Sequence, residues 1–193
     1  MARPGFGGGR FAAARGAPDV AAAVRGLLEP EVPVLEDPAR GLDHGAYVPL
    51  VAMYPPADIP VLQLSIPGLN PKELFELGKT LAPLRDEGVL IFGSGFLTHN
   101  MRYAFRPGVP SWAQEFDAWT ADAITRFDVD ALMDFQTKAP AANIALPTWE
   151  HYAPLLVSAE FAAAVRTPMR SAGRFPLRGV AGEHEVFTPE KGL

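Results

Sequence analysis

Histidine and carboxylate side chains stand beside expected structural elements at three places in the sequence. His99 follows an apolar run that ends in a Gly-Ser-Gly triplet, Glu150 and His151 are neighbours, and His44 lies between an aspartate and a glycine. Imidazole and carboxylate groups bind divalent metal ions, and a further imidazole can exchange a proton with a substrate. These residues therefore indicate a divalent metal site with an acid/base histidine.

His44, Glu150 and the remaining histidine, His184, also have a purely structural interpretation, which the sequence leaves open. His44 precedes an apolar segment with helical spacing, so it could simply cap that segment. A glutamate in the first turn of a helix is favourable for the helix dipole, which would account for Glu150 without any metal. His184 stands between two glutamates, a pattern typical of solvated surface.

Other common chemistries fit the sequence poorly. A serine nucleophile in the Gly93-Ser94-Gly95 triplet would need a glycine two residues before the serine, where Phe92 stands. The glycine run Gly7–Gly9 has neither a preceding strand nor a following Lys-Ser or Lys-Thr, so it does not match a phosphate loop. The absence of cysteine excludes disulfides, thiolate metal ligands and cysteine nucleophiles.

The segment before His99 has the pattern of a strand, helix and strand. Pro60–Ile66 and Val89–Gly93 are nearly continuous apolar runs, which are typical of buried parallel strands. Between them Asn70, followed by a proline, is a strong signal for the start of a helix. One face of this helix is apolar: Leu74, Leu77, Gly78, Leu81 and Leu84. We predict a right-handed βαβ unit over Ile59–Gly95, with His99 outside the carboxyl end of its second strand.

Further elements are expected on both sides of this unit. Thr148 should cap the last of the expected helices, which would put Glu150 and His151 in its first turn. We expect helices over Pro18–Leu28, from Ser111 onward after a capping-box pattern, over Asp128–Phe135 and from Thr148 onward, and strands over Val32–Leu35 and near Glu185–Phe187. The sequence thus predicts an α/β fold.

Length and charge limit the class of protein. The 193 residues suit one domain, which we expect over 18–193 after a disordered or weakly ordered lead-in over 1–17. The net charge is -5 and the basic residues are scattered, so we expect no nucleic-acid partner. No run is long and apolar enough for a membrane span, and the start has no apolar signal core. We expect a cytoplasmic protein.

Five segments carry a resemblance to a known family. They are Gly41–Leu50, Met53–Pro55 with Ala57–Ser65, Leu81–Gly88, Gly93–Asn100 and Glu150–Leu156. In this order and spacing the chain resembles the class III extradiol ring-cleavage dioxygenases, in particular the DOPA-dioxygenase-like branch of the LigB family. The similarity runs from about Pro18 to Val157.

The resemblance implies a fold, a reaction and site residues. The fold would be a single α/β domain with a mostly parallel central sheet flanked by helices. A non-haem Fe(II), or zinc in some members, would be bound, and both atoms of O₂ would be inserted into a catechol-type ring. The resemblance makes His151 a metal ligand and places His99 beside the metal, where it is often counted with the ligands, as an acid/base. His44 would contact the substrate, and Glu150 is an additional candidate ligand.

The chain departs from the family pattern at its start. Relatives begin with two strands that end in His-Gly-Ser-Pro and Ser-His-Trp-like segments, each with a metal-binding histidine, and no histidine precedes His44 here. We therefore expect the usual N-terminal strands to be lacking, and metal binding and catalysis to be impaired unless a second chain, such as another copy, supplies ligands. The alternative is an inactive remnant that binds an aromatic ligand or a partner chain. Substrate, cleavage position, metal and oligomeric state stay open.

Overall fold

The structure is a computed structural model that describes residues 14–29, 31–66, 68, 70–103, 107–163, 169–175 and 184–189. The chain divides into two compact units, and each is described by itself. The first comprises Met1–Ser65 with Pro83–Val89, and the second comprises Ile66–Ala82 with Leu90–Leu193. His44 belongs to the first unit, whereas His99, Glu150 and His151 belong to the second.

The first unit begins with helix α1 (Pro18–Leu28), which confirms the prediction for this segment. Its start combines a proline in the first turn with Asp19, and both features favour a helix N-terminus. The buried residues are Val24 and Leu28, which lie four positions apart on one face. Immediately before the helix, Gly16 forms a parallel bridge with Val61.

The second helix of this unit, α2 (His44–Met53), has none of its residues buried. Its cap is Asp43, whose carboxylate accepts a hydrogen bond from the Ala46 amide at 3.1 Å. His44 is therefore the first helical residue, and the interpretation of His44 as the cap is wrong. Asp43 is held in turn by Gln63, which accepts from the Asp43 amide at 3.0 Å and donates to its carboxylate at 2.8 Å.

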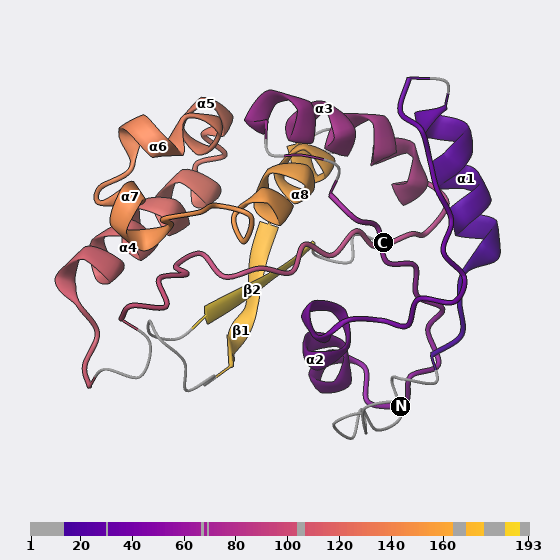
Figure 1. Ribbon diagram of the computed structural model, residues 1–193, viewed down its shortest axis with the longest axis horizontal. Helices are drawn as coiled ribbons and strands as arrows, with labels where there is room; N and C mark the ends of the chain where they lie inside the picture. Colours follow the sequence, from indigo (N-terminus) through magenta and orange to yellow (C-terminus); the bar gives the residue numbers. More distant parts are fainter. Residues whose placement is uncertain are drawn as a thin grey trace. The chain divides into compact units, whose positions relative to one another are not determined.

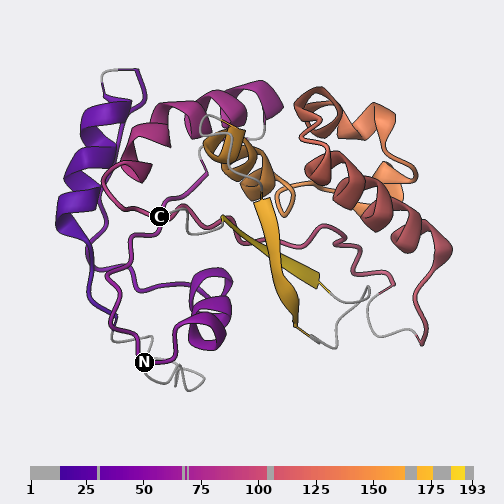
Figure 2. The ribbon, with the colours of Figure 1, turned by 180° about the vertical axis from the view of Figure 1, so that it is seen from behind.

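The second unit contains the predicted amphipathic helix α3 (Pro71–Leu81). Along the chain it is followed by the 3₁₀ turn η2 (Ala82–Arg85), most of which belongs to the first unit. As predicted, Asn70 caps α3 by accepting from the amides of the second and third helical residues. The predicted apolar face is buried: Leu74, Leu77, Gly78 and Leu81. This face packs against α8 (Ala153–Ala163), and the two helices lie side by side in both ribbon views (Figures 1 and 2).

Four more helices of the second unit surround a core of aromatic rings. They are α4 (Ser111–Thr125), α5 (Val129–Met133), α6 (Phe135–Lys138) and α7 (Ala142–Ala145). Phe116, Phe135 and Tyr152 are almost completely buried, and the rings of Phe135 and Tyr152 stack with centroids 4.0 Å apart. The helix predicted over Asp128–Phe135 is interrupted after α5.

Two capping predictions for these helices have opposite outcomes. Asp128 caps α5 as expected, because its carboxylate accepts from the Ala131 amide at 3.0 Å. Ser111 does not cap α4, because Pro110 stands at the cap position and no side chain satisfies the free amides there. The helix thus starts at the serine itself, one residue earlier than the capping-box pattern requires.

The predicted parallel central sheet is not found among the described residues. The strands there are β1 (Met169–Phe175) and β2 (His184–Pro189), which pair antiparallel, and β2 includes the strand predicted near Glu185–Phe187. Within the described part of the chain, the predicted strands over Val32–Leu35, Pro60–Ile66 and Val89–Gly93 form no ladder, apart from the single bridge at Val61. An apolar run becomes a strand only where a neighbouring segment completes its backbone hydrogen bonds.

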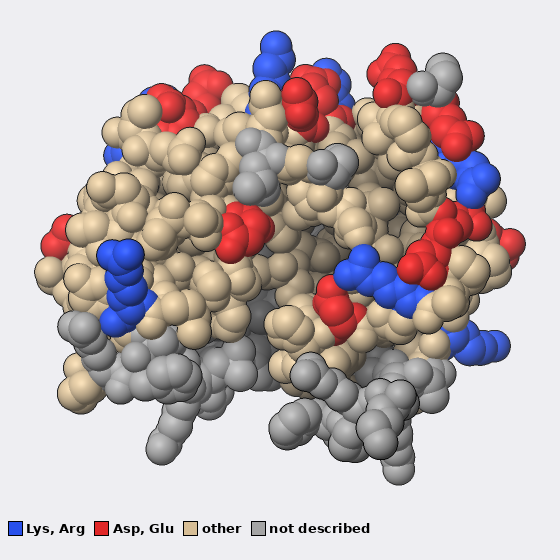
Figure 3. Space-filling model, viewed as in Figure 1, with Lys and Arg blue, Asp and Glu red and all other residues tan. Residues whose placement is uncertain are grey.

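The charged side chains are spread over the face drawn in Figure 3. Lysines and arginines, in blue, are interspersed there with aspartates and glutamates, in red, among uncharged residues. Of the helices in the described segments, none combines the length and apolarity needed to traverse a bilayer.

Candidate functional site

Two imidazoles and a carboxylate converge in the second unit. His99, Glu150 and His151 each offer a ligand atom, and these atoms all lie within 4.8 Å of one another. The two imidazole rings lie against each other, with centroids 3.8 Å apart and planes inclined by 34°. His99 and His151 are half-buried, and Glu150 is exposed. Histidines from two distant segments are thus brought together at one point.

His99 is held by the end of α7. Its backbone amide donates to the Ala145 carbonyl at 2.8 Å, and the buried Asn100 side chain donates to the Ile144 carbonyl at 2.6 Å. The Asn100 side-chain oxygen accepts from the Arg102 amide at 3.0 Å, which closes the turn after His99. This role of Asn100 was not predicted from the sequence, although an asparagine directly after a loop histidine is itself a turn signal.

His151 lies in a turn before α8, and the helix predicted from Thr148 is wrong in its start. The Tyr152 amide donates to the Trp149 carbonyl at 2.9 Å, and the helix begins only at Ala153. The following Pro154 explains the difference, because proline is accepted in the first turn of a helix but costs an amide hydrogen bond farther inside. Glu150 and His151 therefore precede the first helical turn.

The Gly93-Ser94-Gly95 triplet serves close packing. A Cβ atom at Gly95 would collide with the backbone carbonyl oxygen of His151, and one at Gly93 would lie 2.7 Å from the Pro154 carbonyl oxygen. Glycine at both positions therefore allows this segment to lie directly against the start of α8. The next amide, from Phe96, donates to Nδ1 of His151 at 3.4 Å. The close packing of the triplet thus helps to fix the position of His151.

The Glu150 carboxylate is kept ionised by its surroundings. The pKa of Glu150 is lowered, chiefly by a hydrogen bond from its own backbone amide, against a smaller opposing effect of burial. The Thr148 hydroxyl, which donates to the carboxylate at 3.1 Å, and the positive charge that His151 and His99 can carry lower it further. An ionised carboxylate beside two imidazoles is a set of groups suited to a divalent cation.

His44 and His184 are not part of this cluster as described. His44 is exposed at the first position of α2, and the His/carboxylate group found among the described residues does not include it. His184 begins β2, and its side chain lies outside what the structure describes.

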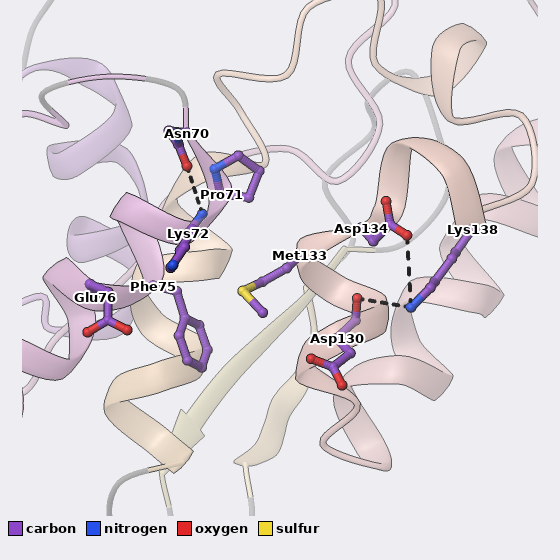
Figure 4. A pocket seen from close by; sticks show the side chains of 9 residues that line it. All are labelled: Asn70, Pro71, Lys72, Phe75, Glu76, Asp130, Met133, Asp134 and Lys138. Carbon is purple, nitrogen blue, oxygen red and sulfur yellow. Dashed lines mark hydrogen bonds and ion pairs between the residues drawn. The ribbon is translucent and has the colours of Figure 1, made fainter.

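A separate hollow of about 670 Å³ lies between the start of α3 and helices α5 and α6 (Figure 4). Its apolar part is formed by Phe75 and Met133, which point into it in Figure 4. Lys138 at its edge contacts the Asp134 carboxylate at 3.9 Å and donates to the Asp130 carbonyl at 3.3 Å. Lys138 is thus paired with groups of neighbouring residues in the same segment, so the lining of the hollow does not indicate a catalytic site.

Comparison with known proteins identifies the family. A family model described as the catalytic LigB subunit of aromatic ring-opening dioxygenase matches residues 11–163. The chain is 45% identical over 150 residues to a 4,5-DOPA dioxygenase extradiol of Beta vulgaris; the aligned region covers 75% of this chain and 56% of the relative. It is 37% identical over 150 residues to a protein of the same name from Escherichia coli strain K12; the aligned region covers 74% of this chain and 55% of that relative.

A solved structure resembles the chain as well. The crystal structure of an uncharacterized protein from Escherichia coli K12 matches with a TM-score of 0.75 and 31% identity, over 89% of this chain and 71% of that chain. This likeness supports a single-domain α/β fold. The chain spans about half the length of the curated relatives it matches. The match over residues 11–163 confirms the resemblance inferred from the five sequence segments: the chain belongs to the LigB family of aromatic ring-opening dioxygenases.

Proposed function

We propose that this chain carries part of the catalytic site of an extradiol dioxygenase that opens the ring of a catechol-type substrate with O₂. The observation that carries the proposal is the meeting of His99, Glu150 and His151, with ligand atoms within 4.8 Å of one another. Membership of the LigB family and relatives named 4,5-DOPA dioxygenase extradiol support it.

The donor set fits the metal that such chemistry uses. Two imidazoles and one carboxylate are the ligand types of non-haem Fe(II) oxygenases, and they leave coordination positions open for a substrate and O₂. Ligand atoms at about 2.1 Å from one ion lie up to about 4.2 Å apart, so a spread within 4.8 Å needs only small side-chain movements. We propose His151 as a ligand and Glu150 as an additional one, with His99 beside the metal, where it is also a candidate ligand. Bound Fe(II), or zinc in its place, would polarise the substrate hydroxyls.

Residues of the chain would bind the diol and accept the proton of one of its hydroxyls. We assign to His99 the role of acid/base, since its imidazole can take up the proton of a substrate hydroxyl when neutral. The ionised Glu150 beside it would stabilise the resulting imidazolium. His44 is proposed to contact the substrate, a role that follows from the family resemblance alone.

A second candidate is binding without turnover. Its support is the donor count, because His99 and His151 give only two imidazoles and Glu150, the third donor, is exposed. A tight metal site needs three or more protein ligands. In this case the chain would bind an aromatic ligand or a partner chain without opening a ring.

The test is an anaerobic Fe(II) titration followed by O₂ and a panel of catechols that includes DOPA. The wild type should bind about one Fe(II) and give a coloured ring-opened product. His151→Ala should weaken Fe(II) binding at least about tenfold, and His99→Ala should lower kcat by about 10²- to 10⁴-fold.

A matched carboxylate control accompanies these variants. Glu150→Gln should weaken Fe(II) binding, whereas the exposed Glu115→Gln on α4 should match the wild type. Equal Fe(II) binding and equal turnover in the wild type and both histidine variants would remove the proposed roles. No Fe(II) uptake and no ring-opened product would favour the second candidate, as would Fe(II) binding without any ring-opened product.

A further inference from the structure

Phe96 is a large apolar side chain left exposed beside the two imidazoles. Its relative exposure is 41%, although aromatic side chains gain the most from burial. Its ring stacks on His99 with centroids 6.1 Å apart and planes inclined by 16°, and lies 5.5 Å from the ring of His151 at 49°. Three rings therefore form one continuous cluster, with an apolar member at its exposed side.

The position of Phe96 is set by its backbone. Its amide donates to Nδ1 of His151 at 3.4 Å, and the preceding Gly95 lies directly against the His151 carbonyl. The side chain is therefore carried on a segment that cannot move away from His151 without losing this packing. A rigidly placed aromatic ring is a better contact surface than a mobile one, because less freedom is lost on binding.

The two sides of the cluster call for a ligand of particular chemistry. The imidazoles with Glu150 offer proton acceptors and metal ligands, whereas Phe96 offers only a flat apolar surface. A planar ring with two adjacent hydroxyls matches both sides at once, since its hydroxyl edge faces the imidazoles while its carbon skeleton contacts the phenyl group. A small ring-free oxygen chelator matches the first side alone.

We infer that Phe96 is a specificity-determining residue that contacts the ring of the aromatic diol and discriminates it from ring-free chelators. This inference rests on the proposed function for the location of the substrate hydroxyls. It adds a residue to which neither the sequence analysis nor the family resemblance assigned a role.

The experiment compares two probes on anaerobic protein loaded with Zn(II), which is redox-inert, so that binding is measured without turnover. The probes are 4-nitrocatechol, followed by its visible absorption, and oxalate, followed by competition. Phe96→Leu keeps an apolar side chain but removes the ring. It should weaken 4-nitrocatechol binding about three- to tenfold, the range of one aromatic pair contact, and leave oxalate binding within about twofold. Phe96→Tyr, which restores a ring, should return 4-nitrocatechol binding to near the wild-type value.

The control is Phe75→Leu, which removes a partly exposed phenylalanine from the separate hollow beside α3 and should leave both affinities unchanged. The inference is overturned if Phe96→Leu binds 4-nitrocatechol as the wild type does, or if it loses affinity for both probes equally, since Phe96 would then act only through the histidines. If discrimination depends on Phe96 but the Fe(II) protein opens no ring, the proposed function fails and the inference stands. If the Fe(II) protein opens the ring but Phe96→Leu discriminates between the two probes as the wild type does, the inference fails and the proposed function stands.

Discussion

Helices α2 and α8 are both mostly apolar in sequence and lack a distinct polar face; His44 is the first residue of α2, and His151 lies two residues before α8. In α8 the start is deeply buried: Tyr152 and Ala153 have no exposed surface, and the helix packs on α3. In α2 no residue is buried, and Val48 and Val51 stay 48% and 43% exposed. Apolar composition alone therefore does not bury a helix, because burial requires a partner surface.

The same contrast separates the two histidine positions. His151 is held by packing, with Gly95 directly against its carbonyl and the buried ring of Tyr152 next to it. His44 is held by polar contacts at the surface, through the cap formed by Asp43 and its exchange of hydrogen bonds with Gln63. Buried packing costs several kcal/mol to disturb, whereas a capping contact is worth about 1 kcal/mol.

The largest expected effect is the loss of Tyr152. Tyr152→Ala removes a fully buried ring that stacks on Phe135, so it should lower the free energy of unfolding by about 3–5 kcal/mol. The matched variant Tyr47→Ala, in the half-exposed middle of α2, should cost less than about 1 kcal/mol. Urea unfolding of both variants measures the difference. Similar losses would mean that the two regions are built alike.

A smaller effect is expected at the triplet that packs on His151. Gly95→Ala places a methyl group against the His151 carbonyl, which should cost about 1–3 kcal/mol of stability and weaken Fe(II) binding about tenfold or more. Gly26→Ala is the control, since nothing lies within 4 Å of that position in α1. Alanine there should stabilise the protein by about 0.5–1 kcal/mol. Unfolding curves and Fe(II) titration test both, and wild-type values for Gly95→Ala would show that the close approach is dispensable.

Removal of the cap of α2 should have a smaller effect on stability, confined to that helix. Asp43→Ala removes the acceptor for the Ala46 amide and should cost about 0.5–2 kcal/mol of helix stability. Hydrogen exchange at the Ala46 and Tyr47 amides measures this local opening. Ser111→Ala at the start of α4 is the control, because its side chain caps nothing there and should change stability by less than about 0.5 kcal/mol. A larger effect at Ser111 than at Asp43 would reverse the assignment of caps.

The smallest effect at neutral pH concerns the Tyr152 hydroxyl, which donates to the Leu132 carbonyl at 3.3 Å. Tyr152→Phe should cost about 0.5–1.5 kcal/mol. Burial raises the pKa of Tyr152, so the folded protein holds this proton more tightly than the unfolded chain does. The stability linked to this group is complete below about pH 10 and falls as the pH rises above it. Unfolding curves from pH 8 to 11 should show a smaller alkaline loss in Tyr152→Phe than in the wild type, and parallel losses would contradict the linkage.

Local signals in the sequence were sufficient for several helices. The bounds of α1 and the start of α3 follow from a proline in the first turn and, for α3, from the Asn70 cap. These signals act within one turn of the chain, so they need no distant partner. They fail where two signals compete, as at Thr148, where the downstream Pro154 moves the helix start to Ala153.

The sequence by itself determined the family, the types of the candidate site residues and the apolar face of α3, because short-range spacing and residue chemistry carry that information. Only the tertiary structure decided that His99 and His151 meet with centroids 3.8 Å apart, that Gly95 and Phe96 position the second imidazole, and that α8 is buried while α2 is not. It also decided that the apolar runs before His99 form no ladder among the described residues. The physical reason is the same in each case: burial and strand pairing depend on which distant segment supplies the other surface.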